Sequence, residues 1–270
     1  MKKSIVVSTQ PTKFSALAFK EDFEKSIKKV AKLGFDGAEL AVRNPQDLKV
    51  KSIINLLKEN NLEVPAIGTG QAYGEEGLSF SDPDEIVRKM AVERINDQII
   101  FASYFKAQVI IGLIRGKIEE SVDREKAEEW TINCLRRCAE RAKEHNIKLT
   151  LEPVNRYESN FINTISEGIE FIKRVGVNNL GLLIDTFHMN IEEVSIYDSI
   201  IQAKDYISHV HFADSNRWAP GCGHLDFRKV IETLKKIDYQ GYISAEILPL
   251  PDPDTAARIT AETLNKLNIN

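Results

Sequence analysis

The chain has 270 residues, of which 36 are Lys or Arg and 40 are Asp or Glu, so its formal net charge is −4. Hydrophobic residues make up 43% and charged residues 28%, a composition that excludes disordered and collagen-like proteins. The acidic balance argues against a nucleic-acid partner, because a basic excess marks surfaces that bind nucleic acid.

The cysteine content and the hydropathy indicate where the protein works. Three cysteines form no disulfide framework, and an odd number of thiols suits a reducing compartment. The sequence has no run of 18 apolar residues, and its start lacks the long apolar stretch of a signal peptide. We therefore expect a cytoplasmic protein that does not bind a membrane.

Short runs rich in Val and Ile alternate with longer amphipathic segments along the whole chain. Eight of these runs are predicted strands, at 4–9, 37–42, 64–70, 108–114, 148–154, 180–186, 207–214 and 241–248. Eight repeats of strand and helix predict an α/β fold, and specifically a closed (β/α)8 TIM barrel rather than an open sheet. No linker or low-complexity tract interrupts this alternation, so a single domain over residues 1–270 is expected.

The segments between the strands have helical periodicity. The segment 22–34 places Phe23, Ile27 and Val30 on one apolar face. Three predicted helices end at residues that suit a left-handed C-cap: Gly34, Asn61 and Gly176. The stretch 84–107 is long enough for one helix or two.

Each of the last four strands carries a polar residue near its carboxyl end, where a buried strand should be apolar on both faces. These residues are Glu152, Asp185, His211 and Glu246. Side chains alternate between faces along a strand, so all four can point into the barrel. Active sites of this fold lie at the carboxyl ends of the strands, and three carboxylates with one imidazole suit Mn²⁺, Mg²⁺ or Co²⁺.

Each of these residues also has a purely structural interpretation. Glu152 alone could cap a helix or form a surface salt bridge, and Asp185 could be the N-cap of the following helix. His211 alone could be a hydrogen-bonded core histidine, which is the role that we expect for His209. The coincidence of four such residues on consecutive strands favours the metal site.

A second polar group follows the same strand ends in the loops, and it consists of Glu158, His188 and Arg217. From these positions over the mouth of the barrel, the side chains could bind hydroxyl and carbonyl oxygens of a ligand. Their alternative role is ordinary solvated loop polarity.

Five segments of the chain are distinctive: GFDGAEL (34–40), EPVNRYES (152–159), DTFHMNIEE (185–193), HVHFADSNRWAPGCGHLDF (209–227) and ISAEIL (243–248). Together they resemble the D-tagatose 3-epimerase and L-ribulose 3-epimerase family of xylose-isomerase-like barrels. The resemblance covers essentially the whole chain. Some members of the family act on keto-sugar acids, for example as 5-keto-L-gluconate epimerases.

The resemblance implies a role for each candidate residue. A Mn²⁺-type ion, with Co²⁺ or Mg²⁺ as alternatives, would be held by Glu152, Asp185, His211 and Glu246. Glu152 and Glu246 would be the two acid/base groups that invert carbon 3 of a ketose, while the loop residues Glu158, His188 and Arg217 would bind the substrate. The resemblance also implies a homodimer or homotetramer.

One segment departs from the family pattern. After the fourth strand, where family members carry aromatic residues, this chain has Arg115 and Lys117. Two cations at the mouth would favour a keto-acid substrate. Alternatively, they would pair with Glu119 and Glu120 on the surface.

Four other functions are compatible with parts of the pattern. An endonuclease IV-type enzyme would need more His ligands than the strands supply. An aldose–ketose or hydroxypyruvate isomerase would move the carbonyl, a dehydratase would release water, and a non-catalytic sugar-binding barrel would turn nothing over.

Overall fold

Eight parallel strands close into a barrel in the computed structural model, which describes residues 1–269. The strands follow one another around the barrel in chain order: β1 (Lys2–Ser8), β2 (Gly37–Ala41), β3 (Ala66–Gly68), β4 (Gln108–Ile111), β5 (Leu149–Leu151), β6 (Leu180–Asp185), β7 (Ile207–Phe212) and β8 (Tyr242–Ala245). Strand β1 pairs with both β2 and β8, which closes the ring. The predicted TIM barrel is therefore confirmed.

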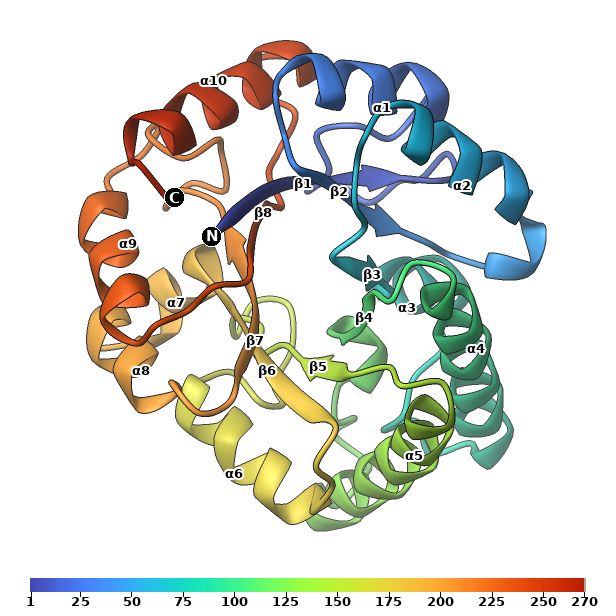
Figure 1. Ribbon diagram of the computed structural model, residues 1–270. Helices are drawn as coiled ribbons and strands as arrows, with labels where there is room; N and C mark the ends of the chain where they lie inside the picture. Colours follow the sequence, from blue (N-terminus) through green and yellow to red (C-terminus); the bar gives the residue numbers. More distant parts are fainter. Residues whose placement is uncertain (270) are drawn as a thin grey trace.

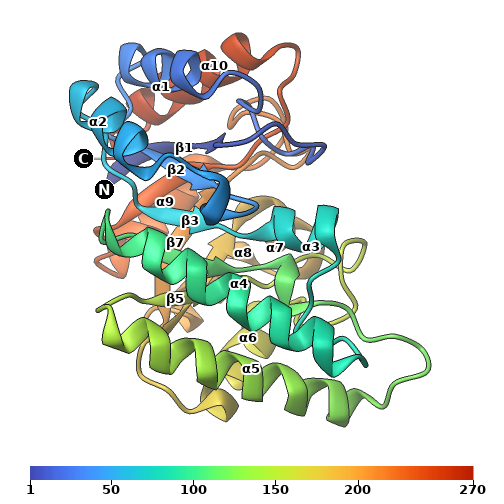
Figure 2. The same ribbon diagram turned by 90° about the vertical axis from the view of Figure 1, so that its right-hand side faces the viewer.

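Helices surround the strands (Figure 1). They are α1 (Phe23–Lys32), α2 (Val50–Glu59), α3 (Gly70–Glu76), α4 (Glu85–Ser103), α5 (Arg124–Glu144), α6 (Ile165–Val175), α7 (Thr186–Glu192), α8 (Ile196–Gln202), α9 (Phe227–Lys236) and α10 (Pro253–Lys266), with short 3₁₀ turns η1 (Pro45–Asp47) and η2 (Leu113–Arg115). The stretch 84–107 forms the single helix α4. The short helices α3 and α7 follow β3 and β6 directly, at the end of the barrel opposite the chain termini (Figure 2).

Helix α1 shows how local sequence sets these elements. The side chain of Asp22 accepts a hydrogen bond from the Lys25 amide and so forms the N-cap of the helix. Ile27 and Val30 are fully buried on its inner face. After the helix, Gly34 has a φ of +76°, a left-handed conformation that glycine adopts without steric cost.

The alternation of side chains along the strands divides the apolar residues into two layers. On β1, Ile5 and Val7 join the large core between the strands and the helices, whereas Val6 belongs to a small cluster on the other face. Ile110 and Leu183 face the barrel interior in the same way. Polar residues that share a face with these interior side chains therefore also point into the barrel.

The chain ends meet at the amino end of the barrel, where the amino group of Met1 donates to the carbonyl of Ile269 over 3.1 Å. The opposite, carboxyl end is where the loops that follow the strands converge (Figure 2). Within residues 1–269, no helix is both long enough and apolar enough to span a lipid bilayer.

Candidate active site at the carboxyl end of the barrel

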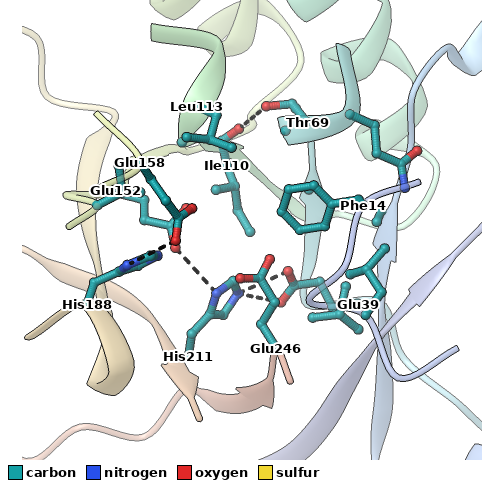
Figure 3. A pocket seen from close by; sticks show the side chains of 18 of the residues that line it. Phe14, Glu39, Thr69, Ile110, Leu113, Glu152, Glu158, His188, His211 and Glu246 are labelled. Carbon is teal, nitrogen blue, oxygen red and sulfur yellow. Dashed lines mark hydrogen bonds and ion pairs between the residues drawn. The ribbon is translucent and has the colours of Figure 1, made fainter. Parts of the chain in front are cut away.

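A cavity at the carboxyl end of the barrel contains most of the predicted site residues (Figure 3). It encloses about 510 Å³ of empty space, including the part open to solvent. Glu152, Glu158 and His188 lie on one side of it and Phe14 on the other. Its lining combines apolar side chains with a few convergent polar groups, as in sites that bind small molecules.

The four predicted metal ligands converge beneath this cavity. Each offers a donor atom within 4.8 Å of the others. Nδ1 of His211 lies 3.5 Å from Oε1 of Glu152 and 3.8 Å from Oδ2 of Asp185. Glu246 follows β8 and completes the group, so strands β5 to β8 each contribute one residue.

Asp185 forms the helix N-cap that was one of the two roles expected for it. Its Oδ1 accepts hydrogen bonds from the Phe187 and His188 amides and so forms the N-cap of α7. Its Oδ2 is buried without a hydrogen-bond partner. One carboxylate oxygen thus fixes the side chain, and the other remains available to a ligand.

Three buried atoms of this cluster have no hydrogen-bond partner: Oε1 of Glu152, Oδ2 of Asp185 and Nδ1 of His211. Buried polar atoms are almost always paired, and a bound ion is one explanation for a group that has no partner within the protein. Oxygen and imidazole donors are the ligands that Mn²⁺ and Mg²⁺ accept. The residues present therefore fit a divalent cation.

Close confinement of these carboxyl groups disfavours their charged forms when no cation is bound. Burial raises the pKa of Asp185 to about 6, and His211 only partly offsets it. Burial also raises the pKa of Glu246 to about 8, against the opposing effect of Arg217. A divalent cation among these carboxyl groups would favour their charged forms.

The loop residues Glu158, His188 and Arg217 also line the cavity. Arg217 donates from Nη1 to Oε1 of Glu158 over 2.7 Å and from Nη2 to Oε2 of Glu246 over 3.0 Å. The guanidinium therefore connects the loop carboxylate to the carboxylate after β8, and it is positioned to contact a substrate between them.

His188 lies at the start of α7 and is 2% exposed. Its Nδ1 lies 2.7 Å from Nδ2 of Asn155, which identifies that ring nitrogen as an acceptor. Burial holds the pKa of His188 well below its ordinary value, and Arg217 lowers it further. The imidazole is therefore neutral and can donate from Nε2.

Arg115 has neither of the two roles suggested from the sequence, which were contact with a substrate carboxylate and a surface ion pair. It is fully buried and donates to the backbone carbonyls of Gly112, Glu152, Phe161 and Ile162. It neither faces a substrate nor pairs with Glu119 or Glu120, because these carbonyls take up its donors. Lys117 is exposed and does not line the cavity.

Glu39 on β2, which is 1% exposed, was not among the residues predicted from the sequence. Its Oε2 lies 2.8 Å from Nε2 of His209, and its Oε1 lies 3.0 Å from Nε2 of His211. His209 is therefore buried and hydrogen-bonded, as expected. Glu39, His209 and His211 form a second group of side chains with potential metal donors. The sequence feature that could have indicated Glu39 is its position as the one charged residue within the otherwise apolar strand GAELA.

Apolar side chains also line the cavity. Phe14 and Leu17 come from the loop after β1, Leu113 from η2 and Val154 from the loop after β5. None of these residues was predicted, because loops that are distant in the sequence bring them together. Such a surface suits the carbon skeleton of a small substrate.

Comparison with known proteins agrees with this architecture. Residues 27–267 match the family model of the xylose isomerase-like TIM barrels. A D-psicose 3-epimerase of Ruminiclostridium cellulolyticum is 33% identical, over 83% of this chain and 78% of that protein. An L-ribulose 3-epimerase of Methylomonas sp. is also 33% identical, over 82% and 77% of the two chains.

Solved structures give the same result. A D-allulose 3-epimerase from Methylomonas sp., in complex with D-allulose, has a TM-score of 0.84 and 26% identity over 98% of this chain and 96% of that chain. The chain therefore belongs to the ketose 3-epimerase family of xylose isomerase-like TIM barrels and is an isomerase of the epimerase class.

Proposed function

We propose that the protein is a metal-dependent epimerase that inverts carbon 3 of a neutral ketose of the L-ribulose, D-tagatose or D-psicose type. The observation that carries this proposal is the convergence of Glu152, Asp185, His211 and Glu246, three of which contribute buried atoms without partners. Its relatives support the choice of reaction, since they are named as epimerases of carbon 3 of ketoses.

The four convergent residues would hold the divalent ion, with Mn²⁺ as the first candidate. When bound, the ion would supply Lewis-acid stabilisation of negative charge on the substrate oxygens at the carbonyl and the neighbouring hydroxyl. Arg217 and the neutral His188 line the same cavity. Both can donate hydrogen bonds to substrate oxygens and so orient the ketose over the cluster.

Glu152 and Glu246 would transfer the protons. They follow β5 and β8, strands that are not adjacent in the barrel, so they approach the cavity from different sides. One carboxylate removes the proton from carbon 3, which gives an enediolate, and the other returns a proton to the opposite face. Two groups are required because a single base would return the proton to the face from which it was taken.

The charges around the cavity favour a neutral substrate over a keto-acid. Its lining includes the carboxylates of Glu39, Glu152, Glu158 and Glu246. Arg217 is the only Lys or Arg that lines it among the described residues, and two carboxylates already pair with this guanidinium. Arg115, which could have received a substrate carboxylate, is bound to backbone carbonyls. A carboxylate on the substrate would therefore be repelled.

This preference can be measured by comparing L-ribulose and D-tagatose with 5-keto-L-gluconate at the same Mn²⁺ concentration. We expect kcat/KM for the keto-acid to be at least about 100-fold lower, the effect of roughly 3 kcal/mol of unpaired charge. Comparable values for the acid and the neutral ketoses would contradict the proposed substrate class. Raised ionic strength screens charge, so as a control it should reduce the difference between the keto-acid and the neutral ketoses.

Arg217→Lys should lower kcat by about 10–100-fold, because a single ammonium cannot reproduce the paired hydrogen bonds to Glu158 and Glu246. The matched control is Arg156→Lys, since Arg156 forms a similar pair with Glu192 outside the cavity. Steady-state kinetics of both variants provide the test. Equal activity in the two variants would exclude a role in catalysis for the paired hydrogen bonds of Arg217.

A further inference from the structure

The imidazole of His211 makes different contacts at its two nitrogens (Figure 3). Nε2 lies 3.0 and 3.1 Å from the two carboxylate oxygens of Glu39. Nδ1 faces the other way, toward Glu152 and Asp185, and has no hydrogen-bond partner. Glu39 and His211 come from β2 and β7, so this contact crosses the interior of the barrel.

An ionised carboxylate only accepts hydrogen bonds, so the contact with Glu39 requires the proton of His211 to be on Nε2. With the proton there, the lone pair of the neutral ring is on Nδ1, the nitrogen that faces the cluster. The other Glu39 contact anchors the carboxylate itself, because Nε2 of His209 lies 2.8 Å from Oε2. Glu39 and both histidines are 1% exposed, so water does not compete for these bonds.

We infer that Glu39 is a positioning residue that fixes the tautomer and the ring orientation of His211, and thereby sets the affinity of the site for a divalent cation. This inference rests on the proposed function, in which His211 is a ligand through Nδ1. Outer carboxylates that accept from the second nitrogen of a ligating histidine commonly have this effect. His209 contributes indirectly by holding Glu39 in place.

The test is a titration of chelator-treated protein with Mn²⁺, in which free Mn²⁺ is measured by electron paramagnetic resonance. Wild-type protein should bind one ion per chain. In Glu39→Gln an NH₂ donor replaces one of the two acceptor oxygens and the negative charge is lost, so the Kd for Mn²⁺ should rise by about 10–100-fold. Glu39→Asp draws the carboxylate back from His211 and should weaken binding in the same direction, which keeps the test usable if the Gln variant does not fold.

Glu63→Gln is the matched control. Glu63 is also a hydrogen-bonded glutamate, but it pairs with Lys2 and Tyr242 and does not line the cavity. Its Kd for Mn²⁺ should equal that of the wild type. The melting temperature of each metal-free variant, measured in parallel, separates metal affinity from stability.

Two results would overturn the inference. One is an unchanged Kd in the folded Glu39 variants, with or without a lower melting temperature, because a purely stabilising residue would behave in that way. The other is two Mn²⁺ ions per wild-type chain and one in Glu39→Gln, because Glu39 would then itself be a ligand. Wild-type protein that binds Mn²⁺ but epimerises no ketose would refute the proposed function instead, and it would leave this test intact.

Discussion

Replacing either Glu152 or Glu246 with Gln is expected to reduce epimerisation by at least about 10³-fold, within the range that positioned acid/base groups contribute. Glutamine keeps the size of the side chain but cannot exchange a proton, so one of the two proton transfers at carbon 3 would fail. The measurement is the rate of product formation at saturating Mn²⁺. Circular dichroism and the melting temperature should show that both variants remain folded.

The two variants also distinguish the proposal from a non-catalytic barrel. A non-catalytic sugar-binding protein would show no turnover in the wild type. Its variants would differ only in their affinity for the sugar or in their stability. Glu63→Gln, at a glutamate that does not line the cavity, should retain wild-type activity. If either variant at Glu152 or Glu246 kept a rate close to that of the wild type, the two-carboxylate mechanism would be wrong.

Replacing Arg115 with Met should destabilise the fold by about 3–5 kcal/mol, because several buried carbonyls would lose a charged donor and each unsatisfied group costs about 1–3 kcal/mol. The change leaves the carbonyls of Gly112, Glu152, Phe161 and Ile162 without their buried donor. At this chain length, about 2–4 °C per kcal/mol corresponds to a fall in melting temperature of roughly 10 °C. The backbone of Glu152 would lose its anchor as well, so activity should also fall.

Arg136→Met is the control for this effect. Arg136 also donates to two backbone carbonyls, those of Val175 and Arg174, but at an exposed helix end. Its replacement should cost less than about 1 kcal/mol, because water can replace the lost donor. Arg115→Lys, with fewer donors, should be intermediate. Similar melting temperatures for the Met variants at positions 115 and 136 would contradict a structural role for Arg115.

The barrel could be predicted because the periodicities of its strands and helices are visible in short stretches of sequence. Alternation of apolar runs with amphipathic segments defines the eight strands, and parity along a strand determines which side chains share a face. Asp185 and His211 are paired in register on the adjacent strands β6 and β7, so their proximity could be predicted from the sequence pattern alone. The same reasoning placed Glu152 and Glu246 at the mouth.

Contacts between distant loops could not be predicted in this way. The carbonyls around Arg115 come from loops after β4 and β5, and no local pattern shows that these loops meet around a guanidinium. Phe14 lines the cavity for a similar reason. Glu39 is different, because a charged residue within a buried strand is a visible signal. It was not predicted because the pattern of polar strand ends was drawn from the last four strands and not from β2.

The most direct test of the central claim is to incubate metal-stripped protein with L-ribulose, D-tagatose and D-psicose in D₂O, with and without Mn²⁺. Chromatography and NMR would then identify the products. We predict Mn²⁺-dependent inversion at carbon 3 with one solvent deuteron incorporated there and the carbonyl left in place. Movement of the carbonyl, loss of water from the sugar, or no turnover by protein that binds Mn²⁺ would contradict the account.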